Sequence, residues 1–283
     1  MIFDCFTFFN ELDLLDARLH ELDGAVDVFV LVEARQTFQG APKPLYFELN
    51  QARYAKFLPR IVHIVVDFPA DVKHLYPKAA SEAWAREYYQ RDQIARGLDK
   101  AAPDDLVIVS DVDEIVCRQR LETCVATRRS DEVSVFAMSA FTGAANRKVK
   151  DFVWNNGPRM LRRRDFTSAQ NVRTLALIGS KTLHRLGAGP GYTRFKNWRR
   201  TGIGNPVRAI DDSGWHFSAI GDWTHYREKL SSYAHEEHKA RKDYSNAEFY
   251  DGEIRQMTDV VDLAQLPEFI RDHPERFKID AKR

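Results

Sequence analysis

The sequence lacks three features that would place it in a specialised class of protein: paired cysteines, long apolar runs and a large net charge. Its three cysteines, Cys5, Cys117 and Cys124, are odd in number and lack the spacing of metal ligands, so we expect reduced thiols. No apolar run approaches the roughly 18 residues that a membrane span needs. The formal net charge of +1 argues against a nucleic-acid-binding protein.

The amino-terminal residues 1–13 also lack the basic region and the cleavage site of a signal peptide, and they are typical of a first core strand. With 44% hydrophobic and 29% charged residues, the composition is that of an ordinary globular protein. We therefore expect a soluble protein that is cytoplasmic by default. A peripheral association with a membrane stays open.

Strands and helices alternate in the first half of the sequence. Apolar runs predict the strands, and leucines at helical spacing (Leu12, Leu15, Leu19 and Leu22) predict a helix. Strands are expected at residues 2–9, 26–33, 61–68 and 106–109, and helices at residues 11–22 and about 80–99. This order predicts an α/β fold with a mixed central sheet flanked by helices.

The second half of the sequence is less regular. Residues 132–141 alternate as a strand does, and residues 142–215, which are rich in glycine and arginine, indicate strands joined by long loops. Residues 225–241 return to helical spacing, and a short helix closes the chain. We expect a single domain over residues 1–283 whose carboxyl-terminal part builds a substrate site.

The stretch DDLVIVSDVDEIV, residues 104–116, places three carboxylates directly after a buried strand. In open α/β sheets, ligands bind beyond the carboxyl ends of the strands. Asp111 and Asp113 point to one side of an extended chain, and two such oxygen ligands suit Mg²⁺ or Mn²⁺, which in turn suits a diphosphate. The alternative is a turn with solvated acids. We expect Glu114 to brace the loop.

Two classes of enzyme carry such a pair of aspartates. Haloacid-dehalogenase-type phosphatases use the first aspartate as a nucleophile, but their pair follows the first strand, whereas this pair follows about the fourth. Ile115 also stands where that motif prefers threonine or valine. Nucleotide-sugar glycosyltransferases of the GT-A fold place the pair after several strands, so the position favours a transferase.

Several blocks of the sequence resemble glycosyltransferase family 17. They are FFNELDLLDARLHEL, VDVFVLVEARQTFQGAPKPLYFE, YYQRDQIARGL, IVSDVDEI and GWHFS. The resemblance covers about residues 3–140 and 213–277. It implies a GT-A-like domain in which residues 1–141 bind the nucleotide and residues 142–283 the acceptor. It also implies a UDP-sugar donor, UDP-GlcNAc in particular, with inversion at the anomeric carbon.

The resemblance suggests roles for polar residues near the ends of the predicted strands. Asn10, Glu11 and Glu33 would read the nucleoside, although helix capping explains Asn10 and Glu11 equally well. Arg91 interrupts an apolar helix stripe, so it would hold phosphate or pair with a carboxylate such as Asp111.

The second half of the sequence would supply a metal ligand and the catalytic base. His216 in GWHFS would complete the Mn²⁺ or Mg²⁺ shell formed by Asp111 and Asp113, unless it is a packed core histidine. Inversion needs a base for the acceptor hydroxyl, and Glu237 and Asp222 are the candidates. Thr224 stands where family members carry a glutamate, so a non-catalytic sugar-nucleotide-binding protein remains a third reading beside the transferase and the phosphatase.

Two basic clusters, residues 159–164 and 194–200, bracket the irregular region. With Trp154 and Trp198 they would bind an anionic acceptor glycan or cover the nucleotide, although a solvated surface explains them more simply. The expected acceptor is a glycan, either a surface polysaccharide or a lipid-linked one.

Overall fold

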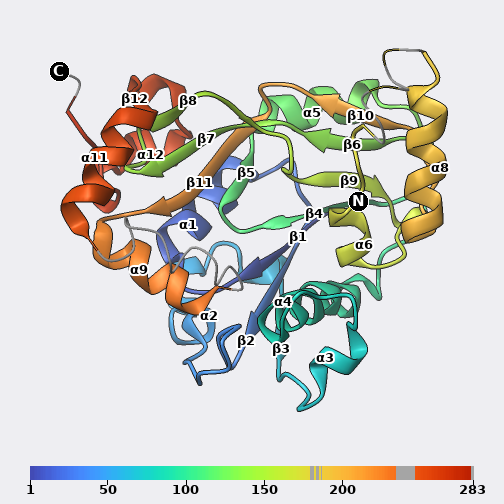
Figure 1. Ribbon diagram of the computed structural model, residues 1–283, viewed down its shortest axis with the longest axis horizontal. Coiled ribbons are helices and arrows are strands. Elements are labelled where there is room, and N and C mark those ends of the chain that lie inside the picture. Colours follow the sequence, from blue (N-terminus) through green and yellow to red (C-terminus); the bar gives the residue numbers. More distant parts are fainter. Residues whose placement is uncertain (179–181, 183–184, 186, 234–245, 282–283) are drawn as a thin grey trace.

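The computed structural model describes residues 1–178, 182, 185, 187–233 and 246–281, and two β-sheets form its framework (Figure 1). The predicted α/β fold with a mixed central sheet flanked by helices is confirmed. Within the described residues, no helix combines the length and the apolar character that crossing a bilayer requires.

The larger sheet has seven strands in the order β10-β6-β9-β4-β1-β2-β3. Its strands are β1 (Ile2–Phe8), β2 (Val28–Ala34), β3 (Ile61–Val66), β4 (Leu106–Asp111), β6 (Val133–Phe136), β9 (Arg159–Arg162) and β10 (Val207–Ile210). The four strands predicted in the first half, β1 to β4, are parallel neighbours, and β9 runs antiparallel between β4 and β6. The carboxyl ends of β1, β2 and β4 therefore lie at one edge of the sheet.

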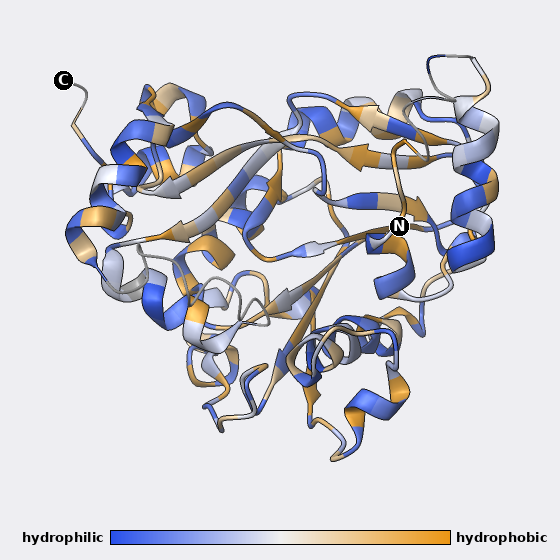
Figure 2. Ribbon diagram, viewed as in Figure 1, coloured by the Kyte–Doolittle hydropathy of each residue, from blue (hydrophilic) through white to orange (hydrophobic). Residues whose placement is uncertain are grey.

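Alternation along β1 explains the helices on both faces of this sheet. Phe6 and Phe8 pack with Leu15 and Leu19 of α1 (Leu12–Glu21) on one face. Phe3 and Cys5 point to the other face, because side chains alternate along a strand. There they pack against α4 (Glu82–Asp92) and the 3-10 helix that follows it. Figure 2 shows these strands as largely hydrophobic and the helices around them as mixed.

The smaller sheet has five strands in the order β12-β8-β7-β11-β5. These strands are β5 (Glu114–Val116), β7 (Met138–Gly143), β8 (Arg147–Trp154), β11 (Gly214–Ile220) and β12 (Thr258–Val260). The single strand expected over residues 132–141 is wrong in one respect: it divides at Ala137 into β6 and β7, which belong to different sheets. Both sheets thus take strands from both halves of the chain.

The remaining helices surround the two sheets. They are α2 (Tyr46–Leu49), α3 (Val72–Leu75), α5 (Arg118–Thr127), α6 (Ala169–Arg173), α8 (Gly189–Thr201), α9 (Trp223–Ser232), α11 (Ala247–Met257) and α12 (Glu268–Asp272). Shorter 3-10 helices cover Gln51–Tyr54, Leu58–Arg60, Gln93–Leu98, Arg163–Asp165, Leu263–Gln265 and Pro274–Arg276.

The expectation of strands joined by long loops over residues 142–215 is wrong for α8, which is a helix. Its sequence begins GPG, which suggested a turn, but proline fits the first turn of a helix because the N–H it lacks has no partner there. Gly202, in the left-handed conformation at φ 78°, ends the helix. Residues 234–241 of the helix expected over 225–241 lie outside the described residues.

Candidate active site

The acidic stretch forms the junction between the two sheets. Asp111 is the last residue of β4, and Glu114 is the first residue of β5, so Asp113 lies in the short turn that crosses from one sheet to the other. In this turn, Asp111 lies opposite Thr7 of β1, whose Oγ1 donates a hydrogen bond to its carboxylate at 3.0 Å. The turn thus places two carboxylates at the carboxyl edge of the larger sheet.

A fully buried arginine, Arg18 of α1, holds this turn from beneath. Its Nε donates to Asp4 at 2.7 Å, and its Nη1 donates to the carbonyl oxygens of Asp111 at 3.0 Å and Glu114 at 2.8 Å. The salt bridge to Asp4 satisfies the buried guanidinium charge. Sequence reasoning missed Arg18, although its place between Leu15 and Leu22 on the apolar stripe of α1 is a signal that could have found it.

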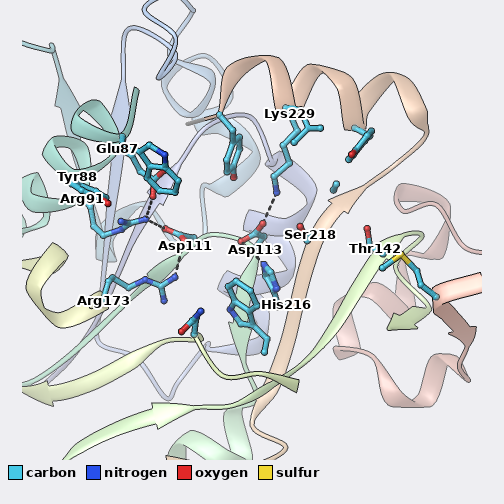
Figure 3. A pocket seen from close by; sticks show the side chains of 18 of the residues that line it. Glu87, Tyr88, Arg91, Asp111, Asp113, Thr142, Arg173, His216, Ser218 and Lys229 are labelled. Carbon is cyan, nitrogen blue, oxygen red and sulfur yellow. Dashed lines mark hydrogen bonds and ion pairs between the residues drawn. The ribbon is translucent and has the colours of Figure 1, made fainter. Parts of the chain in front are cut away.

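Two arginines neutralise Asp111. Its carboxylate accepts hydrogen bonds from Arg91 at 3.3 Å and from Arg173 at 3.0 Å (Figure 3). Burial alone would raise the pKa of Asp111, but these two guanidinium groups outweigh it and hold the pKa well below its usual value. The expected contact between Arg91 and a strand-end aspartate is therefore present, whereas Arg173 of α6 was not anticipated.

Glu114 is held within the protein by three partners. It accepts hydrogen bonds from the indole nitrogen of Trp154 at 2.7 Å and from the backbone N–H of Asp111 at 3.1 Å. Both terminal nitrogens of Arg173 donate to it, at 2.8 and 2.9 Å. Its side chain is 1% exposed. These contacts match the expectation that Glu114 braces the loop.

Asp113 faces a lysine and a histidine across the cavity. The Nζ atom of Lys229 in α9 lies 2.8 Å from Asp113 Oδ2, and the Nε2 atom of His216 in β11 lies 3.9 Å from Oδ1 (Figure 3). Burial alone would lower the pKa of Lys229, but Asp113 outweighs it and raises the pKa well above its usual value. Lys229 is a third residue, after Arg18 and Arg173, that sequence reasoning missed.

The position of His216 depends on a close approach of two strands. His216 pairs with Glu114 in the antiparallel ladder of β11 and β5. At Gly214, two residues earlier, φ is 149°, and a Cβ atom would lie 2.1 Å from the carbonyl oxygen of Ile115. The His216 ring stacks on Trp154 at 4.3 Å between centroids, and its Nδ1 is buried without a hydrogen-bond partner in the described part of the chain.

These side chains line a cavity of about 660 Å³. Its lining includes Asp111, Asp113, His216, Arg91 and Arg173. Aromatic residues contribute much of the remaining wall, namely Trp84, Tyr88, Trp154, Tyr226, Tyr233 and Tyr250. The volume lies within the range of small-molecule sites, and a wall rich in aromatic rings with a few charged groups is typical of them.

A second cavity, of about 580 Å³, lies on the other side of Lys229 and Ala219, which line both. Ala219 has φ 51°, in the left-handed region, where β11 shifts its pairing register against β7. Such a bulge is common next to functional sites because it redirects side chains. The two cavities are therefore divided by a strained position of β11 and by a lysine from α9.

Three of the predicted residues line the second cavity: Asn10, Glu11 and Asp222. The Glu11 carboxylate accepts hydrogen bonds from the backbone N–H groups of Phe9 at 3.2 Å and Asn10 at 3.1 Å, and neither Asn10 nor Glu11 caps α1 through its side chain. Burial raises the pKa of Glu11. Asp222 Oδ1 accepts from the backbone N–H of Thr224 at 2.9 Å, at the start of α9.

Two other predicted residues lie away from these cavities or outside the described chain. Glu33 is fully buried, and its carboxylate accepts from the backbone N–H groups of Tyr46 and Phe47 and from Lys43 Nζ at 3.2 Å. It thereby anchors the start of α2. Glu237 lies outside the described residues.

The predicted metal ligands meet only in part. Asp111 is already engaged by two guanidinium groups, whereas Asp113 Oδ1 and His216 Nε2 face each other at 3.9 Å. Two ligands that each lie about 2.1 Å from one ion can be at most about 4.2 Å apart, so these two atoms are close enough to share one ion. In the part of the chain that the structure describes, no group of three or more histidine, cysteine, aspartate or glutamate residues is arranged to hold a metal.

Comparison with known proteins gives a family for the first half of the chain. Residues 1–137 match the sequence model of glycosyltransferase family 17, which confirms the resemblance over that range. A human β-1,4-mannosyl-glycoprotein 4-β-N-acetylglucosaminyltransferase is 34% identical over 116 residues, which are 38% of this chain and 20% of the human protein. The mouse protein of the same name is 33% identical over the same shares. The chain thus spans about a fifth of the length of the curated relatives it matches.

Among solved structures, a putative nucleotide-diphospho-sugar transferase from Desulfovibrio desulfuricans G20 has a TM-score of 0.37 and 10% identity. The alignment covers 90% of this chain and 96% of that chain. A similarity of this degree does not establish a shared fold or function.

Proposed function

We propose that this chain, whose residues 1–137 match the sequence model of glycosyltransferase family 17, is an inverting glycosyltransferase with a GT-A-like site. It moves a sugar from a nucleotide-sugar donor, which we take to be UDP-GlcNAc, to a glycan acceptor. The family match and the activity in the names of the human and mouse relatives support the reaction type and the donor sugar. The acceptor is a surface polysaccharide or a lipid-linked glycan.

The observation that carries this proposal is the placement of Asp111 and Asp113 at the carboxyl edge of the larger sheet, in the wall of the 660 Å³ cavity. A donor diphosphate brings negative charge to this edge and needs positive partners. The guanidinium groups of Arg91 and Arg173 donate most of their hydrogen bonds to the carboxylates of Asp111, Glu87 and Glu114. Lys229 has three N–H donors and gives one to Asp113 among the described residues, and phosphate oxygens can accept from the same ammonium.

Asp113 and His216 are the residues that would hold Mn²⁺ or Mg²⁺, and Asp111 would contribute by fixing Arg91 and Arg173 beside them. A divalent cation at this place supplies positive charge that stabilises the departing nucleoside diphosphate. The ammonium of Lys229 lies next to the same carboxylate, so a cation held there would compete with it for Asp113 and would leave it available to phosphate oxygens.

Removal of the acceptor proton requires a base near the reacting carbon. Asp222 and Glu237 remain our candidates from the sequence, and Glu11 joins them as a carboxylate in the wall of the second cavity. Asp222 and Glu11 line the second cavity, which adjoins the first at Lys229. The acceptor sugar would then occupy the second cavity and reach the donor past Ala219.

The test is the release of nucleotide from a panel of UDP-sugars with oligosaccharide and lipid-linked acceptors. We expect UDP release that depends on the acceptor and is lost in Asp113→Asn but kept in Asp212→Asn, whose side chain is 80% exposed. Release of phosphate from simple phosphomonoesters would instead support a phosphatase with Asp111 as the nucleophile. Binding of UDP without turnover on any acceptor would leave a non-catalytic binding protein.

A further inference from the structure

The helix α8 directs its small and polar residues toward the protein and its large aromatic residues toward solvent. Gly189, Thr193, Asn197 and Thr201, at spacings of four, are its buried positions. Tyr192, Phe195 and Trp198, on the opposite side, are 40%, 53% and 57% exposed. A surface helix of a globular protein has the reverse arrangement, because burying apolar side chains stabilises the fold.

Specific hydrogen bonds fix this orientation of α8. The side chain of Asn197 both donates to the carbonyl oxygen and accepts from the N–H of Ala176, each at 3.0 Å. Thr167 Oγ1 donates to the carbonyl oxygen of Thr201 at 2.9 Å. A rotation that buried the aromatic rings would break these bonds and leave buried polar groups unpaired. The hydrogen bonds therefore keep the aromatic face of the helix exposed.

The charged residues of the same helix are all basic. Between residues 189 and 201 there are four basic residues, Arg194, Lys196, Arg199 and Arg200, and no acidic residue. Arg199 stands among the exposed rings, while Arg194 and Lys196 flank them at the sides. Long basic side chains beside aromatic rings can keep their stems on apolar material and their charged ends in a polar layer.

We propose that α8 is a membrane-contact helix, which lies on an anionic lipid surface with Tyr192, Phe195 and Trp198 at the level of the headgroups. A basic helix with aromatic residues on one face and a low overall hydrophobicity is the type that binds in the plane of a bilayer interface. The charge complements phosphate headgroups. The rings project from a convex helix, which suits a flat surface better than a pocket-bound ligand.

This contact would hold the catalytic cavity close to the bilayer. α8 packs against α6, and α6 supplies Arg173 and Gln170 to the cavity lining. The proposal stands without the proposed enzymatic function, because it rests on the exposed rings and charges of α8 alone. If both hold, an acceptor carried in the membrane would lie one helix away from the site.

The experiment is the co-sedimentation of the full chain with two kinds of lipid vesicle: phosphatidylcholine alone, and phosphatidylcholine with about one third phosphatidylglycerol. We expect binding to the anionic vesicles that weakens as salt rises. The double variant Phe195→Ser/Trp198→Ser should lower the partition coefficient at least about tenfold, because it removes most of the apolar contact. Arg199→Gln/Arg200→Gln should weaken binding to anionic vesicles only.

The matched control is Phe152→Ser/Leu75→Ser, which removes side chains of similar exposure, 46% and 54%, from β8 and α3. It should bind vesicles as the unchanged protein does. Thermal melting of each variant checks folding. The proposal is overturned if the unchanged protein stays in the supernatant, or if the α8 variant binds equally well. It is also overturned if the α8 substitutions abolish binding to a soluble anionic polysaccharide or self-association of the chain instead.

Discussion

The Nζ atom of Lys229 lies 2.8 Å from Oδ2 of Asp113, and both side chains are largely buried, at 16% and 6% exposure. The ammonium therefore stands beside the carboxylate that the sequence marks as a metal ligand. The positive charge that this acidic turn requires is supplied by the chain itself, through Lys229 at Asp113 and through Arg91 and Arg173 at Asp111. Binding of a divalent cation would have to compete with one of them.

Replacing Lys229 by methionine removes that competitor. We expect the affinity of Lys229→Met for Mn²⁺ alone to rise at least about tenfold in a calorimetric titration. Without Lys229, Asp113 is a buried carboxylate that has lost its cationic partner, and Mn²⁺ would replace that partner. Leaving such a charge unpaired costs more than the ~1.4 kcal/mol that a tenfold change represents. Lys150→Met, at an exposed pair with Asp259, is the matched control and should leave Mn²⁺ binding unchanged. Equal affinities in Lys229→Met and the unchanged chain would show that Lys229 does not occupy the cation's place.

Arg173 joins both carboxylates of the turn, so its loss should affect stability. Arg173→Met removes one of the two guanidinium partners of Asp111 and the guanidinium partner of the buried Glu114, and the free energy of unfolding should fall by about 3–5 kcal/mol. Arg164→Met, which removes an exposed partner of Asp104, should change it by less than about 1 kcal/mol. Urea denaturation measures both. A similar loss of unfolding free energy in the two variants would show that Arg173 does not stabilise the acidic turn.

The lowered pKa of Asp111 predicts how stability depends on pH. A carboxyl whose pKa falls on folding stabilises the protein above its unfolded pKa of about 4 and loses this contribution as the pH falls through the folded value. The difference in unfolding free energy between the unchanged chain and Asp111→Asn should therefore be constant from neutral pH to about pH 5 and shrink below about pH 4. Urea unfolding at several pH values measures it. A difference in unfolding free energy that stays constant over the whole pH range would contradict the ion pairs of Asp111 with Arg91 and Arg173.

The catalytic base can be identified by three matched substitutions, Glu11→Gln, Asp222→Asn and Glu237→Gln. The residue that acts as base should lose kcat by about 10²–10⁴-fold while UDP affinity is kept, because only proton transfer is removed. If Glu11 is the base, its raised pKa places the acid limb of the pH–rate profile above the usual glutamate value of about 4.3. Glu11→Gln activity equal to that of the unchanged chain would leave the other two.

Local sequence patterns predicted the framework of the site. Its basic side chains, in contrast, are brought there in part by contacts between distant parts of the chain. Strand β4 and the placement of Asp111 at its end follow from an apolar run, and Arg91 was found because a charge on an apolar helix stripe needs a partner. Arg173 comes from a short helix in an irregular region, 62 positions after Asp111. No spacing in the sequence links two such positions, because the register of β9 and the docking of α6 bring them together.

The helix α9 also combines positions that local spacing predicts with one that depends on long-range packing. Tyr226, Leu230 and Tyr233 recur at helical spacing within the helix predicted over residues 225–241, and all three line the cavity. Lys229 lies one position off that stripe, so helical spacing does not single it out. Its burial against Asp113 results from the close packing of α9 over β11.

The central claim is that Asp113 belongs to a site for a divalent cation and a nucleoside diphosphate. It is tested most directly by calorimetric titration of UDP, with and without Mn²⁺, into the unchanged chain, Asp113→Asn and the control Asp212→Asn. We predict binding that needs Mn²⁺, is lost in Asp113→Asn and is kept in Asp212→Asn. Binding of UDP by Asp113→Asn with unchanged affinity and unchanged Mn²⁺ dependence would contradict the claim.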